Sequence, residues 1–476
     1  MASYFSSILF HAMDCIGFSR QMILLRSDIA NNMYETVSEN CAEYLCMEVI
    51  LAGSKSEGVT QTNASDNDLM LVLRKCICVD TGRQENDFIV LEAITKDCPP
   101  GYTQLRLVND GNMDIPDIFY MASEYDIIKG VLLLKSAGFH KFFTLVSADI
   151  PSFDGLEQKY TAINGPAFSM IVERSNYLGI KSAKIYNDHV LAMPYYSFTI
   201  LTEWKNRVRH YEWPPASLIH DVSTMEGFVV PIGHKLSEEQ HFEWRICYTT
   251  AERQLITSLN ETQLKLYIVI KMVNKNVIKP VLDCVTSYML KNVILWVTEC
   301  SPLCIQHSSY LTRFMIQSLW FLLHCLLNNH LPNYMIPSRN LLLGKMKSDQ
   351  KQTLTRLLGD LINEGDTIVL RCDKLKNAMF ILVSNQSLAF AFKVWRDEVE
   401  KLILEINRNI TIKTRPDMIL RSSYIYDMCY EYWKDESYMV NIFRLYSLLN
   451  VDIFSLTQNG IQNFQDIVTC LDNLLS

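Results

Sequence analysis

The spacing of apolar residues changes from strand-like to helix-like partway along the chain. Residues 20–45 carry apolar side chains at helical spacing with few helix breakers, which predicts a long helix. Shorter apolar runs between turn-forming residues predict strands at 47–54, 68–80, 87–94, 168–174, 182–193 and 195–201, with a turn-rich stretch at 100–115. From about residue 240, apolar positions recur three and four apart, which predicts helices at 241–258, 262–275, 281–298 and 308–328.

Helical spacing continues beyond Lys345. It covers 348–363, 386–409, 423–449 and 460–475, and we find no repeat of fixed period. We therefore expect an α+β fold in three units: 1–215 with an N-terminal helix and a sheet, 216–345 helical, and 346–476 a helical region of unknown role. The sequence leaves open whether this last region packs on the helical unit or forms a separate module.

The composition is that of an ordinary globular protein. Of the 476 residues, 49% are apolar and 20% are charged, and glycine and proline are too few for a disordered or collagen-like chain. The net charge of −8 argues against a histone-like protein but not against one local basic face. Lys205, Arg207, Arg209 and His210 are candidates for such a face, although a solvated charged strand end or helix is the simpler interpretation.

Cysteine usage and the apolar segments indicate a soluble, cytoplasmic protein without a membrane partner. The 14 cysteines are scattered without paired spacing, which fits a reducing compartment. His11 and Asp14 interrupt the apolar N-terminal run, as a secretory signal would not. The longest apolar stretch, 316–327, is shorter than the roughly 20 residues that a bilayer span requires.

The strongest local signal is the segment GSKSEGVTQTNASDNDLML at 53–71. Asp66 and Asp68 lie two apart at the start of a predicted strand, a spacing that puts two carboxylates on one face and suits Mg²⁺. Gly53 allows close approach of a triphosphate, and Ser54 offers a hydroxyl and an N–H to phosphate oxygens. The alternative is a solvated Asp-Asn-Asp turn, but a Gly-Ser turn after a strand, twelve residues upstream, weakens it.

A two-metal phosphoryl-transfer site needs a third carboxylate from another strand. Asp188 is the best candidate because it is a charge inside an otherwise apolar, strand-like run. An exposed residue on an edge strand explains the pattern equally well.

Two helical segments supply candidates for nucleotide contacts. In WRICYTTAERQLI, helical spacing places Arg245 and Glu252 on one face, where together they suit a triphosphate and the edge of a purine, or form a surface ion pair. In VTSYMLKNVILW, Ser287, Tyr288 and Lys291 fall beside the apolar stripe. Tyr288 then either stacks on a base or packs in the core.

Lys271 lies on an apolar stripe, where a lysine either extends its ammonium to water or faces a buried anion.

Cys300, Cys304 and His307 have a spacing that suits zinc. A fourth ligand is not evident and free cysteine is often buried, so we expect no zinc.

These segments occur in the order of a known family. The segments that carry this order are GSKSEG (53–58), SDNDLM (65–70), NGPA (164–167), DHVLAM (188–193), EW and WPP (203–215), GFVVPIGH (227–234), EWRICYTTAE (243–252), SYMLKN (287–292) and LPNYMIPSRNLL (331–342). From about Ile16 to Lys345 the chain resembles the cyclic GMP-AMP synthase-like receptors and the wider Mab-twenty-one-like proteins. Each segment is weak alone, but nine in order are specific.

The resemblance implies a bilobed nucleotidyltransferase fold, with a mixed-sheet catalytic lobe, a helical lobe and the active site between them. It implies that Gly53 and Ser54 form the phosphate-binding turn and that Asp66, Asp68 and Asp188 bind Mg²⁺ or Mn²⁺. It further implies that Arg245 and Glu252 contact one nucleotide, and that Lys271, Ser287, Tyr288 and Lys291 contact the other, with Tyr288 stacking on its base.

Two positions depart from the pattern of the family. The DNA-sensing relative carries a His/Cys zinc insertion where residues 253–266 of this chain hold neither Cys nor His, so the resemblance favours double-stranded RNA or an unidentified ligand over DNA as activator. Cys247 stands where some relatives have Ser, a change that bears on base preference.

The sequence thus favours a ligand-activated enzyme that joins ATP and GTP into a cyclic dinucleotide for innate immune signalling. The alternatives are a catalytically inactive Mab-twenty-one-like protein acting in binding or development and, less favoured, a template-independent RNA polymerase. A pseudoenzyme has no need to keep all three carboxylates, and this chain keeps them. The sequence leaves the oligomeric state open.

Overall fold

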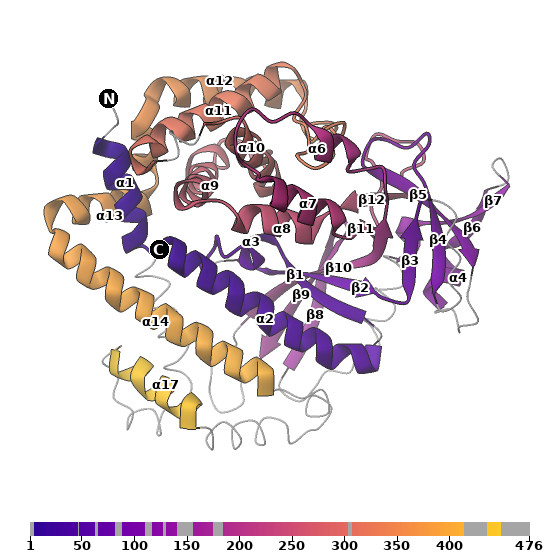
Figure 1. Ribbon diagram of the computed structural model, residues 1–476, viewed down its shortest axis with the longest axis horizontal. Coiled ribbons are helices and arrows are strands. Elements are labelled where there is room, and N and C mark those ends of the chain that lie inside the picture. Colours follow the sequence, from indigo (N-terminus) through magenta and orange to yellow (C-terminus); the bar gives the residue numbers. More distant parts are fainter. Residues whose placement is uncertain are drawn as a thin grey trace.

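The computed structural model describes residues 4–45, 47–61, 65–80, 88–109, 117–126, 130–139, 156–174, 184–302, 307–413 and 436–448. Within this part of the chain, a mixed β-sheet lies beside a group of helices (Figure 1). Its strands are β1 (Met47–Ala52), β2 (Asn67–Leu73), β3 (Cys76–Val79), β4 (Ile89–Ile94), β5 (Tyr102–Asn109), β6 (Ser123–Asp126), β7 (Val131–Leu134), β8 (Leu156–Asn164), β9 (Ala167–Arg174), β10 (Lys184–Tyr196), β11 (Gly227–Val230) and β12 (Glu243–Cys247).

The long strand β10 organises the sheet. The main path runs β1-β2-β10-β11-β12-β5-β4-β3, and β10 pairs in parallel with β2 and also with β3. It is antiparallel to β9 and β11, so the sheet is mixed. The register between β10 and β2 sets Asp188 opposite Asp68. Strand pairing thereby fixes two of the candidate carboxylates side by side.

The described helices fall into an N-terminal pair, a central group and a C-terminal group. They are α1 (Tyr4–Cys15), α2 (Arg20–Leu45), α3 (Gly53–Ser56), α4 (Asp117–Ala122), α6 (Thr202–Asn206), α7 (Ala216–Thr224), α8 (Thr249–Thr257), α9 (Glu261–Val273), α10 (Ser287–Glu299), α11 (Leu311–Leu327), α12 (Ser348–Glu364), α13 (Asp373–Ser384), α14 (Gln386–Lys413) and α17 (Glu436–Leu448). A capping box between Asn260 and Gln263 begins α9. The Thr286 side chain accepts from the N–H of Met289 and begins α10.

The C-terminal helices pack on the N-terminal ones. Figure 1 shows α14 running alongside α2, and α13 lies against α1. At this contact, Arg26 of α2 donates two hydrogen bonds to Glu400 of α14, both 2.7 Å long. The region that follows Lys345 therefore does not stand apart, because α14 packs on the long N-terminal helix α2, α13 on α1 and α12 on α11. The predicted helix at 460–475 and residues 423–435 lie outside the described residues.

Helical predictions are confirmed for 20–45, 262–275, 281–298, 308–328, 348–363 and 386–409, give or take a few residues. Three predictions about strands and turns are wrong. The segment 68–80 is two strands, because the chain turns at Arg74 and Lys75. The stretch 100–115 contains β5, and 195–201 continues β10 for two residues and then turns.

The segment 241–258 is also not one helix. Strand β12 occupies its first part and α8 its second, since burial alternates along Trp244, Arg245 and Ile246 with the two-residue period of a strand. Strands β11 and β12 both follow residue 215 and pair within the sheet. The sheet therefore extends beyond the boundary expected near 215.

Two helical stretches, Tyr4–Glu39 and Ser308–Leu327, are long and apolar enough to cross a membrane by length and composition. About half of each is buried inside the protein. Packing within the fold accounts for the apolar side chains of the buried half.

Candidate active site

A cleft of about 540 Å³ opens between the sheet and helices α8, α9 and α10. Eight of the eleven predicted site residues line it: Gly53, Ser54, Asp68, Arg245, Glu252, Ser287, Tyr288 and Lys291. These residues come from strands, a turn and helices that lie far apart in the sequence. The remaining three, Asp66, Asp188 and Lys271, lie immediately beside it, as their contacts below show.

The turn after β1 brings a glycine against a carboxylate. Gly53 has a positive φ of 66°, and a Cβ at this position would collide with the Asp68 carboxylate. The next residue, Ser54, accepts a hydrogen bond of 2.6 Å from the Lys271 ammonium. Gly53 thus gives room to Asp68, and Ser54 joins the sheet side of the cleft to α9.

Asp68 and Asp188 form a like-charged pair on adjacent parallel strands. Partial desolvation of the Asp68 carboxylate is the main cause that raises its pKa to about 6, and the nearby carboxylates of Asp188 and Asp66 add to this shift. One oxygen of Asp188 accepts a hydrogen bond of 2.6 Å from Ser169 on β9. Asp188 is therefore held in place, and the pair retains a charge repulsion that a cation would relieve.

Asp66 lies just before β2 rather than within it and is exposed. The strand argument for placing Asp66 and Asp68 on one face therefore does not hold as stated. Lys55 lies nearby: its ammonium donates to Asn67 at 2.8 Å, and it interacts electrostatically with both aspartates. Within the described ranges, no group of three Asp, Glu, His or Cys residues is arranged to hold a metal ion.

The oxygen donors nevertheless suit a hard cation. Asp68 and Asp188 supply carboxylates side by side at the cleft wall, and carboxylate oxygens are the ligands that Mg²⁺ and Mn²⁺ prefer. Mg²⁺ or Mn²⁺ would be held by this pair, and Asp66 is near enough to influence it electrostatically.

On the helical side, a buried network joins the predicted residues Lys291, Glu252 and Tyr288 to Glu57, which was not predicted from the sequence. The Lys291 ammonium lies 2.5 Å from Glu57 and 3.3 Å from Glu252. Although burial opposes its charge, these two glutamates hold the pKa of Lys291 well above the usual range. Lys291 is thus a paired cation in the cleft wall, not one free to meet phosphate.

Tyr288 is fixed through its hydroxyl. It donates to Glu252 at 2.8 Å and accepts from the amide of Asn333 at 2.9 Å. Its ring is half-buried and lines the cleft, while Ser287 beside it is exposed. The hydroxyl bonds hold the ring in one orientation, as a stacking platform requires.

The pKa of Lys271 is shifted in the opposite direction from that of Lys291. Burial is the main cause that lowers the pKa of Lys271 to about 8; Glu57 opposes this shift, and Lys291 adds to it. The half-buried ammonium bonded to Ser54 therefore changes charge near physiological pH.

Residues 254–359 match the family model of the Mab-21 protein HhH/H2TH-like domain. The chain thus carries a Mab-21 domain. The match covers residues 254–359 of the 476, and the Mab-21 domain belongs to the superfamily of cyclic GMP-AMP synthase and other nucleotidyltransferases. The Mab-21 domain supplies Ser287, Tyr288 and Lys291 to the cleft lining and Lys271 beside it, and Asp68 comes from the sheet that precedes this domain.

The Mab-21 domain also brings two cations to the cleft that sequence reasoning missed. Arg339 and Lys345 line it from the segment after α11. The motif that contains Arg339 was recognised, but nothing in a loop sequence indicates which side chains face a distant strand. Arg245 joins them from β12, and not from a helical face shared with Glu252, which lies on α8.

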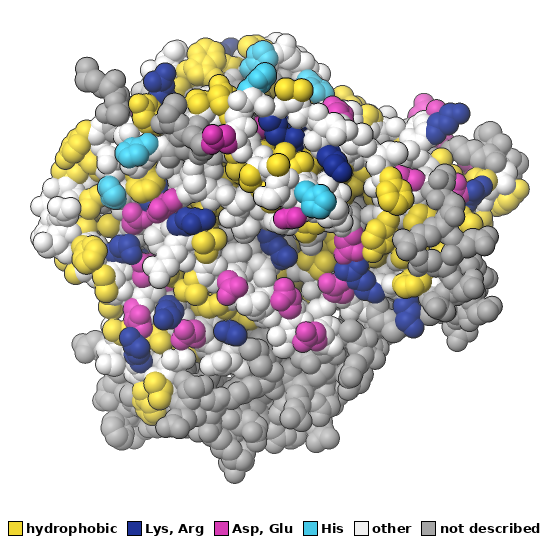
Figure 2. Space-filling view, in the orientation of Figure 1, with side chains coloured by type: hydrophobic (Ala, Val, Ile, Leu, Met, Phe, Trp, Pro, Cys, Tyr) yellow, Lys and Arg dark blue, Asp and Glu magenta, His cyan; other side chains and the backbone are white. Residues whose placement is uncertain are grey.

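The candidate basic segment near residue 207 turns inward. Arg207 and Arg209 both contact the buried carboxylate of Glu299, at 2.8 and 3.1 Å, and Arg207 stacks over the Trp296 ring. Neither a basic face nor a solvated segment describes these two arginines. On the face seen in Figure 2, Lys and Arg side chains are interspersed with Asp and Glu.

Cys300 follows α10 and is exposed, and His307 contacts Ser309. Cys304 lies outside the described residues.

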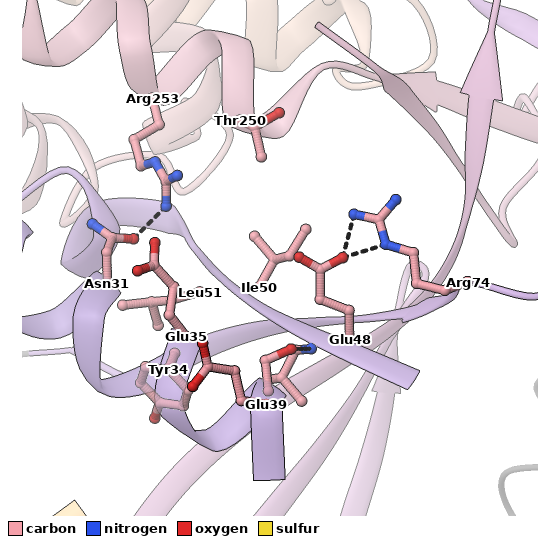
Figure 3. A pocket seen from close by; sticks show the side chains of 12 residues that line it. Asn31, Tyr34, Glu35, Glu39, Glu48, Ile50, Leu51, Arg74, Thr250 and Arg253 are labelled. Carbon is pink, nitrogen blue, oxygen red and sulfur yellow. Dashed lines mark hydrogen bonds and ion pairs between the residues drawn. The ribbon is translucent and has the colours of Figure 1, made fainter. Parts of the chain in front are cut away.

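A second pocket, of about 480 Å³, lies between α2, β1 and α8 (Figure 3). Its charges are largely satisfied inside the protein: Arg74 contacts Glu48 and Glu226, and Arg253 donates to Asn31. Glu35 and Glu39 add negative charge. This pocket holds none of the residues predicted for the site.

Proposed function

We propose that this protein is a metal-dependent nucleotidyltransferase that joins ATP and GTP into a cyclic dinucleotide second messenger of innate immunity in the cytoplasm. The observation that carries the proposal is the cleft itself. It sets the Gly53-Ser54 turn and the Asp68–Asp188 pair opposite Tyr288 and Glu252 of the helical side. Phosphate and base contacts thus face each other across one space, as two nucleotides would require.

Each residue has a role that its surroundings support. Ser54 and Lys271 bind phosphate oxygens, since their hydroxyl and ammonium are already adjacent. Tyr288 stacks on one base while Glu252 fixes its hydroxyl. Asp188 keeps one oxygen on Ser169 and offers the other to the proton of the attacking ribose hydroxyl.

Bound Mg²⁺ or Mn²⁺ would act as a Lewis acid, neutralising phosphate charge. Asp68 and Asp188, with Asp66 beside them, are the residues that would hold it.

The direct test incubates the purified full chain with all four labelled nucleoside triphosphates and Mg²⁺ or Mn²⁺. The reactions run alone, with double-stranded RNA and with double-stranded DNA. Formation of a phosphatase-resistant dinucleotide from ATP and GTP is expected. Chain extension of RNA would instead indicate a polymerase.

One observation favours the inactive alternative. Among the described residues Asp66 and Asp68 are both exposed, and no three Asp, Glu, His or Cys side chains are arranged to hold a metal ion. A Mab-21 protein without catalysis would bind nucleotides in the same cleft but form no product under any activator or metal, and the same assay separates the two functions.

Double-stranded RNA is the activator that we propose first. The link from α8 to α9 is only Ser258–Asn260, too short to contain a zinc-bearing insertion. RNA would be gripped through phosphates and 2′-hydroxyls, so activation should depend on duplex length and not on sequence. It should fade between roughly 50 and 200 mM salt as phosphate contacts are lost. Activation by DNA alone would exclude RNA as the activator.

A further inference from the structure

The cleft continues into a smaller pocket whose charged lining is entirely positive. This pocket has a volume of about 130 Å³, and the two share Arg245, Arg339 and Lys345. Its lining residues also include Lys235 and His234 but no Asp or Glu. We call this pocket, with Lys235, Arg245, Arg339 and Lys345, the cationic annex.

The cations of the annex have no acidic partner among the residues that the structure describes. Within the described part of the chain, no carboxylate lies at ion-pair distance from any of the four. The Arg339 guanidinium donates to the carbonyl of Ile246 at 3.5 Å and lies over the ring of Tyr102. Elsewhere in the structure, half-buried or buried cations such as Arg207 and Lys291 pair with glutamates. The annex therefore retains positive charge that an external anion would neutralise.

The position of Arg339 is built into the fold. Gly101 has a positive φ of 79°, and a Cβ there would lie 2.7 Å from Cδ of Arg339. The aliphatic part of the Arg339 side chain thus fills the space that a side chain at position 101 would take. Tyr102 beneath it is held edge-on by His234. Partial loss of hydration, and then the nearby Lys235, Arg245 and Arg339, lower the pKa of Lys345, as expected if the four cations converge.

We propose that the cationic annex binds the triphosphate of the second nucleotide. This inference rests on the proposed function, in which two triphosphates enter one cleft. The acidic wall with Asp68 and Asp188 receives one of them together with its metal. The second triphosphate would meet repulsion at that wall and needs positive charge elsewhere. The annex provides it at the same cleft, lined jointly by Arg245 and Lys345.

The test measures binding of inorganic tripolyphosphate to the full chain in EDTA, by calorimetry. Without metal, Asp68 and Asp188 oppose binding of the probe at their own wall, and the contribution of the annex is read from the affinity that annex variants lose. Lys235→Ala and Lys345→Ala are suited because both side chains are exposed and their loss leaves the core intact. Each should weaken the affinity about tenfold, the usual worth of one charged phosphate contact. Arg356→Ala, an exposed cation of α12 outside the annex, should not change it.

Arg339→Ala should have a larger effect, and its melting curve shows whether the protein still folds. Arg339→Lys should restore part of the affinity, because it keeps charge but not the planar fork. Unchanged affinity in Lys235→Ala and Lys345→Ala would overturn the annex as a phosphate site. If the wild-type protein binds tripolyphosphate through the annex but does not join nucleotides, the catalytic proposal is wrong and the annex remains a phosphate site.

The source of the phosphate is decided by comparing GTP, ATP, guanosine and tripolyphosphate on wild type and Lys345→Ala. A nucleotide site predicts that one triphosphate binds more tightly than tripolyphosphate, and that Lys345→Ala weakens this triphosphate but not guanosine. Tight tripolyphosphate binding with no gain from a base would assign the annex to a free polyphosphate and overturn the nucleotide assignment.

Discussion

The candidate cleft and the contact between α2 and α14 both gather charged side chains, but they differ in how the charge is balanced. In the cleft, Asp68 faces Asp188, and Arg339 and Lys345 have no carboxylate partner in the described structure. At the α2–α14 contact, Glu400 lies between Arg26 and Arg396, and all three are buried.

The difference indicates two uses of charge. Buried charges that pair within the protein hold elements together, and removing one partner leaves the others unbalanced. Charges left unpaired in a cleft cost folding free energy that only a ligand of opposite charge recovers. The cleft should therefore tolerate charge removal in stability but not in function, and the α2–α14 contact should behave in the opposite way.

The largest effect is expected from Asp66→Asn with Asp68→Asn. Product formation should fall by about 10³-fold or more, because metal ions supply several kcal/mol of transition-state stabilisation. The pKa of Asp68 is raised, so its charged form is disfavoured in the folded state, and the melting temperature should not fall. Labelled dinucleotide assays and thermal unfolding check both parts; retained product would contradict the metal assignment.

Glu400→Gln should produce the next largest effect, this time on stability. It leaves the buried Arg26 without a counterion and removes one of the two carboxylates that Arg396 contacts, the other being Asp397, which should lower the free energy of unfolding by about 3–5 kcal/mol. The matched control is Glu398→Gln, whose partner Arg444 is exposed; its effect should stay below about 1 kcal/mol. Urea unfolding measures both, and equal effects would remove the contrast with the cleft.

The same glutamate predicts an acid dependence. Although burial opposes its charge, Arg26 and Arg396 lower the pKa of Glu400 to about 2. Because the pKa of Glu400 is lower in the folded state than in the unfolded state, the ionised carboxylate stabilises the fold. This stabilisation is complete above about pH 4.5 and is lost as the pH falls toward 2. Wild type should therefore lose stability over this range more steeply than Glu400→Gln, as unfolding curves at several pH values would show. Parallel curves would mean that the ion cluster does not stabilise the fold.

Tyr288→Ala should weaken nucleotide binding by about 1–3 kcal/mol, the usual worth of one aromatic stack. Tyr288→Phe is the matched control, because it keeps the ring and loses only the hydroxyl bonds with Glu252 and Asn333. If the ring serves only as core, Tyr288→Ala should lower the melting temperature and leave affinity unchanged. Calorimetry and thermal unfolding on one preparation separate these readings.

The smallest effect concerns the pH dependence of binding. Lys271 is charged below its pKa of about 8 and neutral above it, so metal-free nucleotide affinity should fall, by about tenfold at most, between pH 7 and 9. Lys271→Arg keeps its charge throughout and should bind with a flat profile over the same range. A falling profile in both proteins would assign the titration to another group.

Part of this structure follows from local pattern. Helices α2, α9, α10 and α14 were predicted because their apolar spacing is sustained over many residues. The strand β12 was missed because its short apolar run reads equally well as the start of α8. Strand β5 was missed because turn residues before it obscured an alternating pattern.

The sequence by itself determined which chemical groups the site contains. A glycine next to a serine, aspartates two apart and an aromatic residue beside a lysine are visible without a structure, since they depend on residue type and local spacing. Eight of the eleven predicted residues line one cleft.

Only the tertiary structure decided how these groups are paired. Strand register set Asp188 against Asp68, and chain folding placed Glu57 on Lys291, Arg207 on Glu299 and Arg339 beside Arg245. Such pairs join residues up to hundreds of positions apart, and local spacing carries no information about them. Whether a charge is neutralised or left open to a ligand depends on these long-range neighbours, because electrostatic interaction depends on distance in space and not on separation along the chain.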